Sequence, residues 1–146
     1  MEWTTELRYK RYEDWTEEEK KQIKENMAKS PWHTHYHVEP TSGLLNDPNG
    51  FSYFDGKWIL FYQNFPFGAA HGLKSWVQLE SDDLVHFNET GVKVFPDTPL
   101  DSHGAYSGSA MQFDDKLFLF YTGNVRDENW IRHPYQIGAL MDKEGK

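Results

Sequence analysis

Short apolar and aromatic runs, separated by Asn, Asp, Gly and Pro, begin after residue 33 and continue along the chain. Two of these stretches, 51–62 and 110–121, are related by a constant offset of 59 residues, with Phe, Asp, Lys, Leu, Phe and Tyr recurring in register. Each stretch holds two runs joined by a tight turn, and Asp55-Gly56 in the first is a favoured two-residue hairpin turn. The pattern therefore predicts two β-hairpins that are copies of one structural unit.

Further runs extend each hairpin into a sheet. Residues 75–81 and 84–87 follow the first hairpin as a predicted third and fourth strand, and residues 135–141 follow the second hairpin. A unit that recurs roughly every 60 residues favours an all-β fold of the β-propeller type, with a β-sandwich of two similar hairpins as the alternative. Because propellers have at least about four blades, residues 33–146 are expected to form an incomplete propeller domain, with a first blade and most of a second.

The N-terminal segment has a different pattern. Residues 16–29 contain neither Gly nor Pro, and Thr16 and Glu19 have the spacing of a capping box. The few apolar positions predict a helix that lies on a larger body and ends before Ser30-Pro31. Residues 1–32 are therefore expected to be an N-terminal helical extension.

Composition and charge exclude several classes of protein. A formal net charge of -8 argues against nucleic acid as a partner, and the lack of cysteine excludes disulfides and thiolate chemistry. No apolar run reaches membrane-spanning length, and the N-terminus lacks the features of a secretory signal, so a cytoplasmic protein without a membrane partner is expected. The aromatic content of 16% suits β-structure and also surfaces that stack on sugars.

Two groups of polar residues are candidates for chemistry. Asn46-Asp47-Pro48-Asn49-Gly50 precedes the first hairpin, and its residue types are those of a turn, so the residues alone do not separate a functional carboxylate from turn chemistry. His33, His35 and His37 alternate, which would place three possible metal ligands on one face of a strand. With no fourth ligand in view, no metal and no cofactor are predicted.

Four ordered motifs resemble those of glycoside hydrolase family 32, which includes invertases, fructanases and sucrose-6-phosphate hydrolases. Residues 40–50 resemble the segment that presents the family's nucleophilic aspartate, and residues 61–63 resemble its aromatic-Tyr-Gln motif. Residues 81–87 resemble the run that closes the first blade, and residues 106–109 resemble the Phe-Ser-Gly-Ser motif that opens the second. The resemblance covers residues 36–125.

This resemblance implies a five-bladed β-propeller with Asp47 as the catalytic nucleophile. It also implies a group of residues that contact the sugar: Leu44, Leu45, Asn46, Gln63, Tyr106 and Ser107. Leu44-Leu45 stands where the family often has Trp-Met. The family's pocket tryptophan aligns with His71, and both His71 and Trp76 are candidates for its role, with core packing as the alternative for Trp76.

A retaining glycosidase needs two carboxyl groups about 5 to 5.5 Å apart, one as nucleophile and one as acid/base. Asp47 would supply the first. The family's Glu-Cys motif, which carries the acid/base, and its Arg-Asp-Pro motif do not occur in the sequence, and Arg126-Asp127 is interpreted as a solvated loop pair. We therefore expect residues 1–146 alone to be inactive.

The expected function is that of an N-terminal fragment of a β-fructofuranosidase acting on sucrose or sucrose 6-phosphate through a fructosyl-Asp47 intermediate. The start of the chain and residues 71–76 resemble cytoplasmic bacterial members that cleave phosphorylated sucrose. A non-catalytic carbohydrate-binding propeller module and a related fructosyltransferase are the alternatives. An incomplete second blade leaves an unpaired edge, so the fragment is expected to associate with itself.

Overall fold

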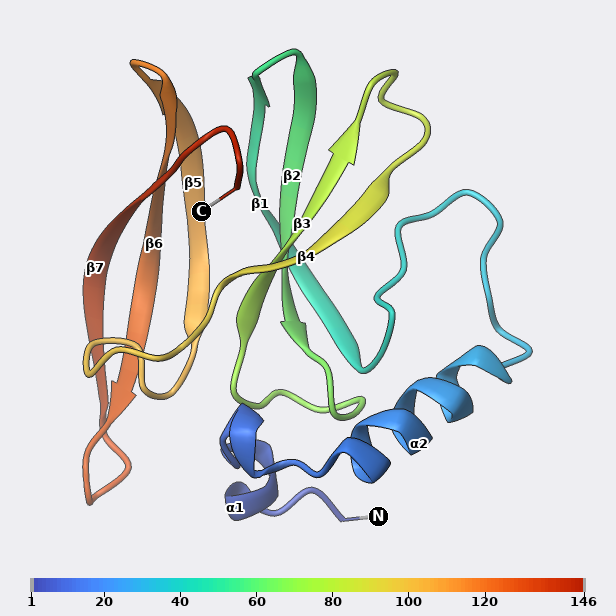
Figure 1. Cartoon of the computed structure of the whole chain (residues 1–146). Helices are drawn as coiled ribbons and strands as arrows, with labels where there is room; N and C mark the ends of the chain where they lie inside the picture. Colours follow the sequence, from blue (N-terminus) through green and yellow to red (C-terminus); the bar gives the residue numbers. More distant parts are fainter. Residues whose placement is uncertain (1, 146) are drawn as a thin grey trace.

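The computed structural model describes residues 2–145 as two antiparallel β-sheets with a helical segment below them (Figure 1). The first sheet has the order β1-β2-β3-β4, formed by Leu44–Phe54, Lys57–Phe65, Ser75–Ser81 and Asn88–Val94. The second has the order β5-β6-β7, formed by Ala105–Phe113, Lys116–Arg126 and Arg132–Met141. The predicted all-β class is confirmed.

Both predicted hairpins are present. β1 pairs with β2 around Asp55-Gly56, and β5 pairs with β6 around Asp114-Asp115. Asp55, Gly56 and Asp114 have φ angles of 47°, 81° and 53°. Asp and Gly are among the residues that accept this left-handed backbone most readily, so local chemistry specifies both turns.

The predicted fourth strand at residues 84–87 is wrong, because β4 begins at Asn88. Side chains from the end of β3 bind the backbone of this segment instead. Ser81 Oγ accepts the N–H of Leu84 at 2.8 Å, and Asp83 Oδ1 accepts the N–H groups of Val85 and His86 at 2.9 and 2.8 Å. These bonds make a turn in which Leu84 has a φ of 66°, and the strand starts only after it.

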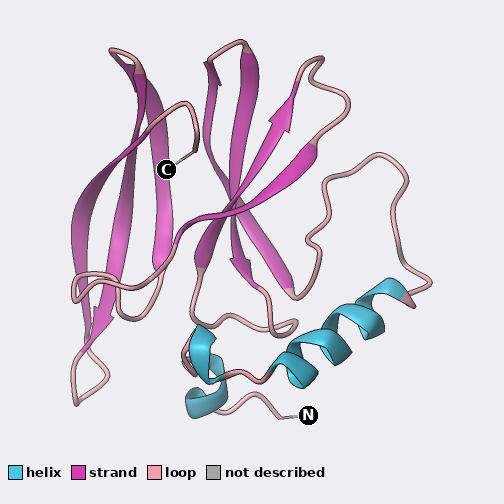
Figure 2. Ribbon diagram, in the orientation of Figure 1, coloured by secondary structure: helices cyan, strands magenta, loops and turns pink. Residues whose placement is uncertain are grey.

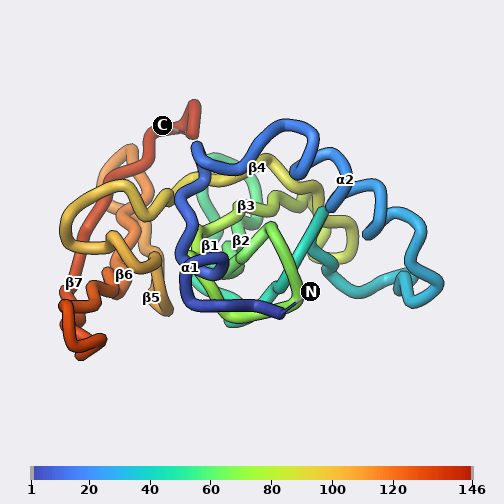
Figure 3. The backbone as a smooth tube through the Cα atoms, turned by 90° about the horizontal axis from the view of Figure 1, so that it is seen from below, coloured from blue at the N-terminus to red at the C-terminus, as the bar shows by residue number. Residues whose placement is uncertain are grey.

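The two sheets share one apolar core. Phe61 and Trp76 of the first sheet pack in one cluster with Leu117, Leu119 and Tyr121 of the second. The first strands of the two sheets, β1 and β5, are in contact, and the later strands of each sheet lie progressively farther from this junction (Figures 1 and 3). This arrangement is that expected of neighbouring propeller blades, whereas the number of blades stays a prediction.

The predicted helix is α2, Glu17–Ala28, and its capping box is present: Thr16 Oγ1 accepts the N–H of Glu19 at 3.2 Å. Two shorter elements were not predicted, the helix α1 at Thr5–Arg8 and the 3-10 helix η1 at Tyr12–Asp14 (Figure 2). Their short length gives no periodic signal in the sequence.

The helical segment packs closely on the loop that joins β2 and β3. The ring of Trp15 is 5% exposed and stacks on Phe67 with a centroid distance of 4.3 Å. The backbone N–H of Leu73 donates to the carbonyl of Arg8 at 2.7 Å, and the Tyr12 hydroxyl donates to the carbonyl of Leu73 at 3.0 Å. The N-terminal segment thus holds the residues just before Lys74 in place.

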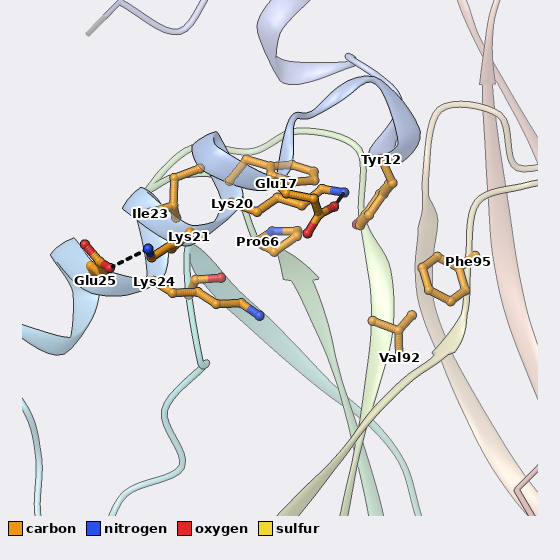
Figure 4. A pocket seen from close by; sticks show the side chains of 12 residues that line it. Tyr12, Glu17, Lys20, Lys21, Ile23, Lys24, Glu25, Pro66, Val92 and Phe95 are labelled. Carbon is orange, nitrogen blue, oxygen red and sulfur yellow. Dashed lines mark hydrogen bonds and ion pairs between the residues drawn. The ribbon is translucent and has the colours of Figure 1, made fainter.

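A groove of about 530 Å³ lies between α2 and the first sheet (Figure 4). Apolar side chains, including Ile23, Val92 and Phe95, line it together with Lys21 and Lys24 of α2. None of the predicted substrate-binding residues is among its lining residues.

The three alternating histidines do not lie on a strand. Residues 33–37 have irregular backbone, and His33 Nδ1 lies 2.8 Å from Glu39 Oε2. Within residues 2–145, no group of three or more His, Cys, Asp or Glu side chains is placed to hold a metal ion. In the same part of the chain, no helix has the length and apolar character needed to cross a membrane.

Candidate active site

Asp47 lies at a β-bulge in β1. The register passes from Asn46 opposite Gln63 to Pro48 opposite Tyr62, so Asp47 is an extra residue without a partner on β2. Its φ angle is 23°, an unusual value for a residue other than glycine. Bulges of this kind redirect a side chain out of the regular alternation of a strand. Here Asp47, at the bulge, is exposed, whereas the preceding residue, Asn46, is half-buried.

Ser107 occupies the corresponding bulge of the second sheet. On β5 the register passes from Tyr106 opposite Thr122 to Gly108 opposite Tyr121, which leaves Ser107 unpaired in the same way. The Ser107 hydroxyl donates to Asp47 Oδ2 at 2.7 Å. Two irregularities in separate sheets therefore meet at one carboxylate.

Gln63 connects the two sheets below this carboxylate. Its side chain is 1% exposed, and its Nε2 donates to Asp47 Oδ2 at 3.2 Å and to Ser107 Oγ at 2.9 Å. Its Oε1 accepts from Asn46 Nδ2 at 3.0 Å. Asn46, Asp47, Gln63 and Ser107, which the sequence assigned to the site, are thus joined in one hydrogen-bond network.

Asn49 supports this network from behind. Its amide nitrogen donates to the Asp47 backbone carbonyl at 2.7 Å, and its Oδ1 accepts the N–H of Gly108 at 3.0 Å. Gly108 has no space for a side chain, because a Cβ atom there would lie 2.1 Å from the carbonyl oxygen of Phe120. Asn49 is 5% exposed and fixes the two bulges relative to each other. From the sequence alone, Asn49 is expected only as a turn residue.

The electrostatic environment keeps Asp47 ionised. The hydrogen bond from Ser107 is the main cause that lowers the pKa of Asp47, the side chain of Asn46 contributes next, and the positive charge of Lys74 adds to both. The limited burial of the carboxyl group opposes these effects only in part. The group is thus a carboxylate at neutral pH, the form needed for nucleophilic attack.

Lys74 is a site residue that the sequence motifs do not predict. The residue is 4% exposed, and its ammonium nitrogen donates to Asn46 Oδ1 at 2.6 Å and lies 2.8 Å from His71 Nδ1. It also lies 5.6 Å from the centroid of the Tyr106 ring. His71 and Tyr106, both predicted to bind substrate, therefore flank the network. A lone lysine between Leu73 and Ser75 carries no local signal of this role.

The other predicted substrate-binding residues are placed differently. Trp76 is 0% exposed, packs between Phe61 and Tyr121, and donates its indole N–H to the carbonyl of Tyr106 at 3.0 Å. This burial favours core packing over a sugar-binding wall. Leu44 and Leu45 are half-buried and pack against two separate apolar clusters beside the site.

Other carboxylates of the chain are engaged elsewhere. Glu39 accepts from Thr34 and His33, and Glu80 pairs with Lys57 at 3.3 Å. Asp101 accepts from Tyr121, and Asp127 accepts from the backbone of its own loop and lies 2.9 Å from His133. None of these four groups contacts Asp47. Asp127 lies in the loop after β6, as expected, whereas Arg126 is the last residue of β6. Both are half-buried, so the expectation of a solvated loop pair is only partly correct.

Comparison with known proteins agrees with this geometry. Residues 37–146 match the family profile described as "Glycosyl hydrolases family 32 N-terminal domain". The chain belongs to this family.

Individual relatives are similar over nearly the whole chain. A sucrose-6-phosphate hydrolase of Streptococcus mutans is 74% identical over 95% of this chain and 29% of its own length. One from Lactococcus lactis is 56% identical over 100% of this chain and 31% of its own length. The solved structure of sucrose-6-phosphate hydrolase from Lactobacillus gasseri superposes with a TM-score of 0.95 at 53% identity, covering 99% of this chain and 30% of that one.

A more distant structure also matches. A Bombyx mori β-fructofuranosidase, solved as a mutant in complex with sucrose, has a TM-score of 0.70 at 29% identity and covers 90% of this chain and 29% of its own. This chain therefore spans about a third of the length of the relatives it matches.

Proposed function

We propose that residues 1–146 form the N-terminal part of a retaining β-fructofuranosidase, with Asp47 as the nucleophile and sucrose 6-phosphate as the substrate. The observation that carries the proposal is the exposed Asp47 carboxylate, whose Oδ2 receives hydrogen bonds from both Ser107 and Gln63. Such bonds fix the carboxylate and hold it ionised. The names of the similar bacterial proteins support the phosphorylated substrate.

The reaction proceeds in two steps. Because the bonds from Gln63 and Ser107 both end on Oδ2, Oδ1 is the atom that attacks the anomeric carbon of the fructosyl unit. A bond forms between Oδ1 and this carbon while the glycosidic bond breaks, and the leaving oxygen takes a proton from the acid/base. Water, activated by the same acid/base, then adds to the anomeric carbon and releases Asp47 as a carboxylate.

The acid/base carboxyl group is supplied by a part of the polypeptide outside residues 1–146. The engagement of Glu39, Glu80, Asp101 and Asp127 with other partners supports this assignment. The remaining sheets of the proposed five-bladed propeller would belong to the same part, which is consistent with this chain covering only 29–31% of the length of its relatives. The location is cytoplasmic, where a phosphorylated sugar would be met.

The test uses a full-length polypeptide that begins with this chain. Asp47→Asn keeps the shape of the side chain but removes the anionic nucleophile, so hydrolysis of sucrose and sucrose 6-phosphate should be lost. Asp114→Asn is the matched control, because Asp114 is exposed in a turn with a φ of 53° that asparagine also adopts. Unchanged turnover in the Asp47 variant would overturn the proposal.

Product analysis separates the alternatives. A fructosyltransferase would keep Asp47 as nucleophile but form a new glycoside in place of free fructose. A carbohydrate-binding module would bind sugar without cleavage in the wild type. In the hydrolase, mass spectrometry should find a fructosyl ester on the peptide that contains Asp47 once the acid/base is removed.

A further inference from the structure

Lys74 is a buried lysine whose ammonium group contacts the side chains of Asn46 and His71. Burying an ammonium group is costly unless its donors are bound. Lys74 is 4% exposed as a residue, and Asn46 Oδ1 at 2.6 Å is the shortest hydrogen bond of its ammonium nitrogen. Asn46 directly precedes Asp47 on β1. The Lys74 ammonium group is connected to the Asp47 carboxylate through two side-chain amides, those of Asn46 and Gln63.

An ammonium group donates hydrogen bonds and cannot accept them, so it determines the polarity of its partners. Lys74 requires the oxygen of the Asn46 amide to face it, which turns Asn46 Nδ2 toward Gln63 Oε1 at 3.0 Å. Gln63 must then direct its Nε2 toward Asp47 Oδ2 and Ser107 Oγ, at 3.2 and 2.9 Å.

The orientation of the Ser107 hydroxyl, the last group in this series of hydrogen bonds, is determined in the same way. Because the Ser107 oxygen receives an N–H from Gln63, its own hydrogen is directed to Asp47 Oδ2 at 2.7 Å. Every hydrogen bond in the series thus has one direction, from the donor-only ammonium of Lys74 to the acceptor-only carboxylate of Asp47.

Without the cation, only the Asp47 carboxylate at the other end would favour this orientation. The amides of Asn46 and Gln63 could then each turn by 180° with almost no change in shape, since oxygen and NH₂ are similar in size. A reversed Gln63 would place a carbonyl oxygen against the Asp47 carboxylate. We propose that Lys74 is a positioning residue that fixes the orientation of the Asn46 and Gln63 amides and so directs their donors, and that of Ser107, to the nucleophile. This inference rests on the proposed function only for its effect on catalysis.

Charged and titratable groups surround Lys74 from several elements. The charge of Asp47 acts on Lys74 from β1, and His71 contacts it from the β2–β3 loop. The Tyr106 ring of β5 is near two cations, with its centroid 5.6 Å from the Lys74 ammonium nitrogen and 5.1 Å from the guanidinium carbon of Arg132 on β7. Burial lowers the pKa of Lys74, and the charge of Asp47 opposes this shift. A direct charge effect on Asp47 is therefore the competing explanation, and the experiment must separate it from orientation.

Lys74→Met keeps the length of the side chain but removes the charge and the donors. Lys93→Met is the matched control, because Lys93 is a half-buried lysine of the same sheet that donates to the carbonyl of Gly145 at 3.2 Å. In the full-length polypeptide, Lys74→Met should lower kcat by about 10- to 100-fold, as misplacement of reacting groups does. Lys93→Met should leave kcat unchanged.

A double-mutant cycle with Asn46→Ala distinguishes orientation from direct charge. If Lys74 acts through the Asn46 amide, Lys74→Met has no further effect on kcat once Asn46 is alanine. If it acts through space on Asp47, the two effects multiply, and the proposal is overturned.

Nuclear magnetic resonance provides a readout that does not depend on activity. In the wild type, the Gln63 NH₂ protons should show Overhauser contacts to the Ser107 β protons, and in Lys74→Met these contacts should weaken as a second orientation becomes populated. Asn46→Asp, which keeps a partner for Lys74, should move them to the β protons at position 46, because a carboxylate accepts only. If the Overhauser contacts of Gln63 are unchanged in both Lys74→Met and Asn46→Asp, the positioning role of Lys74 is overturned, even if Asp47→Asn abolishes activity. If Asp47→Asn is active but these contacts shift, only the proposed reaction fails.

Discussion

Asp47 and Ser107 occupy equivalent positions in the two repeated sheets, and their side chains form a hydrogen bond of 2.7 Å. Each is the extra residue of the bulge in the first strand of its sheet. The hairpin turns repeat with an offset of 59 residues, whereas Asp47 and Ser107 are 60 residues apart, because β1 has a second irregularity between Asn49 and Ser52 that β5 lacks. The same bulge thus carries a carboxylate, Asp47, in the first sheet and the hydroxyl that donates to it, Ser107, in the second.

Ser107→Ala should weaken catalysis and shift its pH dependence. Ser107 is the main cause of the lowered pKa of Asp47, so its removal raises that pKa toward the usual value. The acidic limb of the kcat/KM profile, which reports ionisation of the nucleophile, should therefore move to higher pH. At neutral pH the loss should be about 1–3 kcal/mol of transition-state stabilisation.

The control for this variant is Ser109→Ala, an exposed serine two residues along the same strand. A kcat/KM profile of Ser107→Ala that coincides with that of Ser109→Ala would show that the hydrogen bond to Asp47 has no catalytic role.

Gln63→Ala should reduce both activity and stability. From sequence alone, a polar residue at a strand end is expected to contribute little to the core, but Gln63 is 1% exposed and its side chain bonds to Asn46, Asp47 and Ser107. Removing it leaves the Asn46 amide without its acceptor, at a cost of about 1–3 kcal/mol in the free energy of unfolding. Urea denaturation measures this loss, and a midpoint equal to that of the wild type would contradict it.

Asp101→Ala should destabilise the fold without changing the reaction. Asp101 is 0% exposed, and its carboxylate accepts from the Thr98 N–H, the Thr98 hydroxyl and the Tyr121 hydroxyl at 2.7 to 2.8 Å. The buried Tyr121 hydroxyl would be left without its acceptor, at a cost of about 1–3 kcal/mol. Thermal melts should show this loss for Asp101→Ala but not for Asp97→Ala, an exposed neighbour. A selective loss of kcat at unchanged stability would instead place Asp101 in the reaction.

A polypeptide of residues 1–146 alone should be inactive and should associate with itself. One face of the second sheet carries Met111, Phe113, Phe118, Phe120 and Leu140, in a continuous series across β5, β6 and β7, and four of these are 45–59% exposed. Exposed apolar patches of this kind act as contact surfaces. Light scattering should therefore report species larger than a monomer, and assays on sucrose and sucrose 6-phosphate should show no turnover.

Phe120→Asp places a charge in the middle of this face and should favour the monomer. Val85→Asp, which changes an equally apolar side chain in an exposed turn away from the face, should not. A wild-type fragment that is monomeric at all concentrations would contradict the expected association, and robust turnover would mean that the second carboxyl group lies within these residues.

The sequence determined the features that depend on neighbours along the chain. The Asp-Gly turn and the capping box at Thr16 arise from contacts within a few residues, and the two hairpins are visible as a direct repeat in the sequence. The structure has each of these features. The motifs around Asp47 also indicated the family, because the residues of each motif are neighbours in the sequence.

The tertiary structure decided the features that join distant segments. Lys74 meets Asn46 across 28 positions and Ser107 meets Asp47 across 60, and no local pattern specifies which side chains meet when two sheets pack. The start of β4 also escaped prediction, because side-chain hydrogen bonds from Ser81 and Asp83 outweighed the apolar character of residues 84–87. Trp76 was open to two interpretations, and the packing of the second sheet against the first left its ring in the shared core.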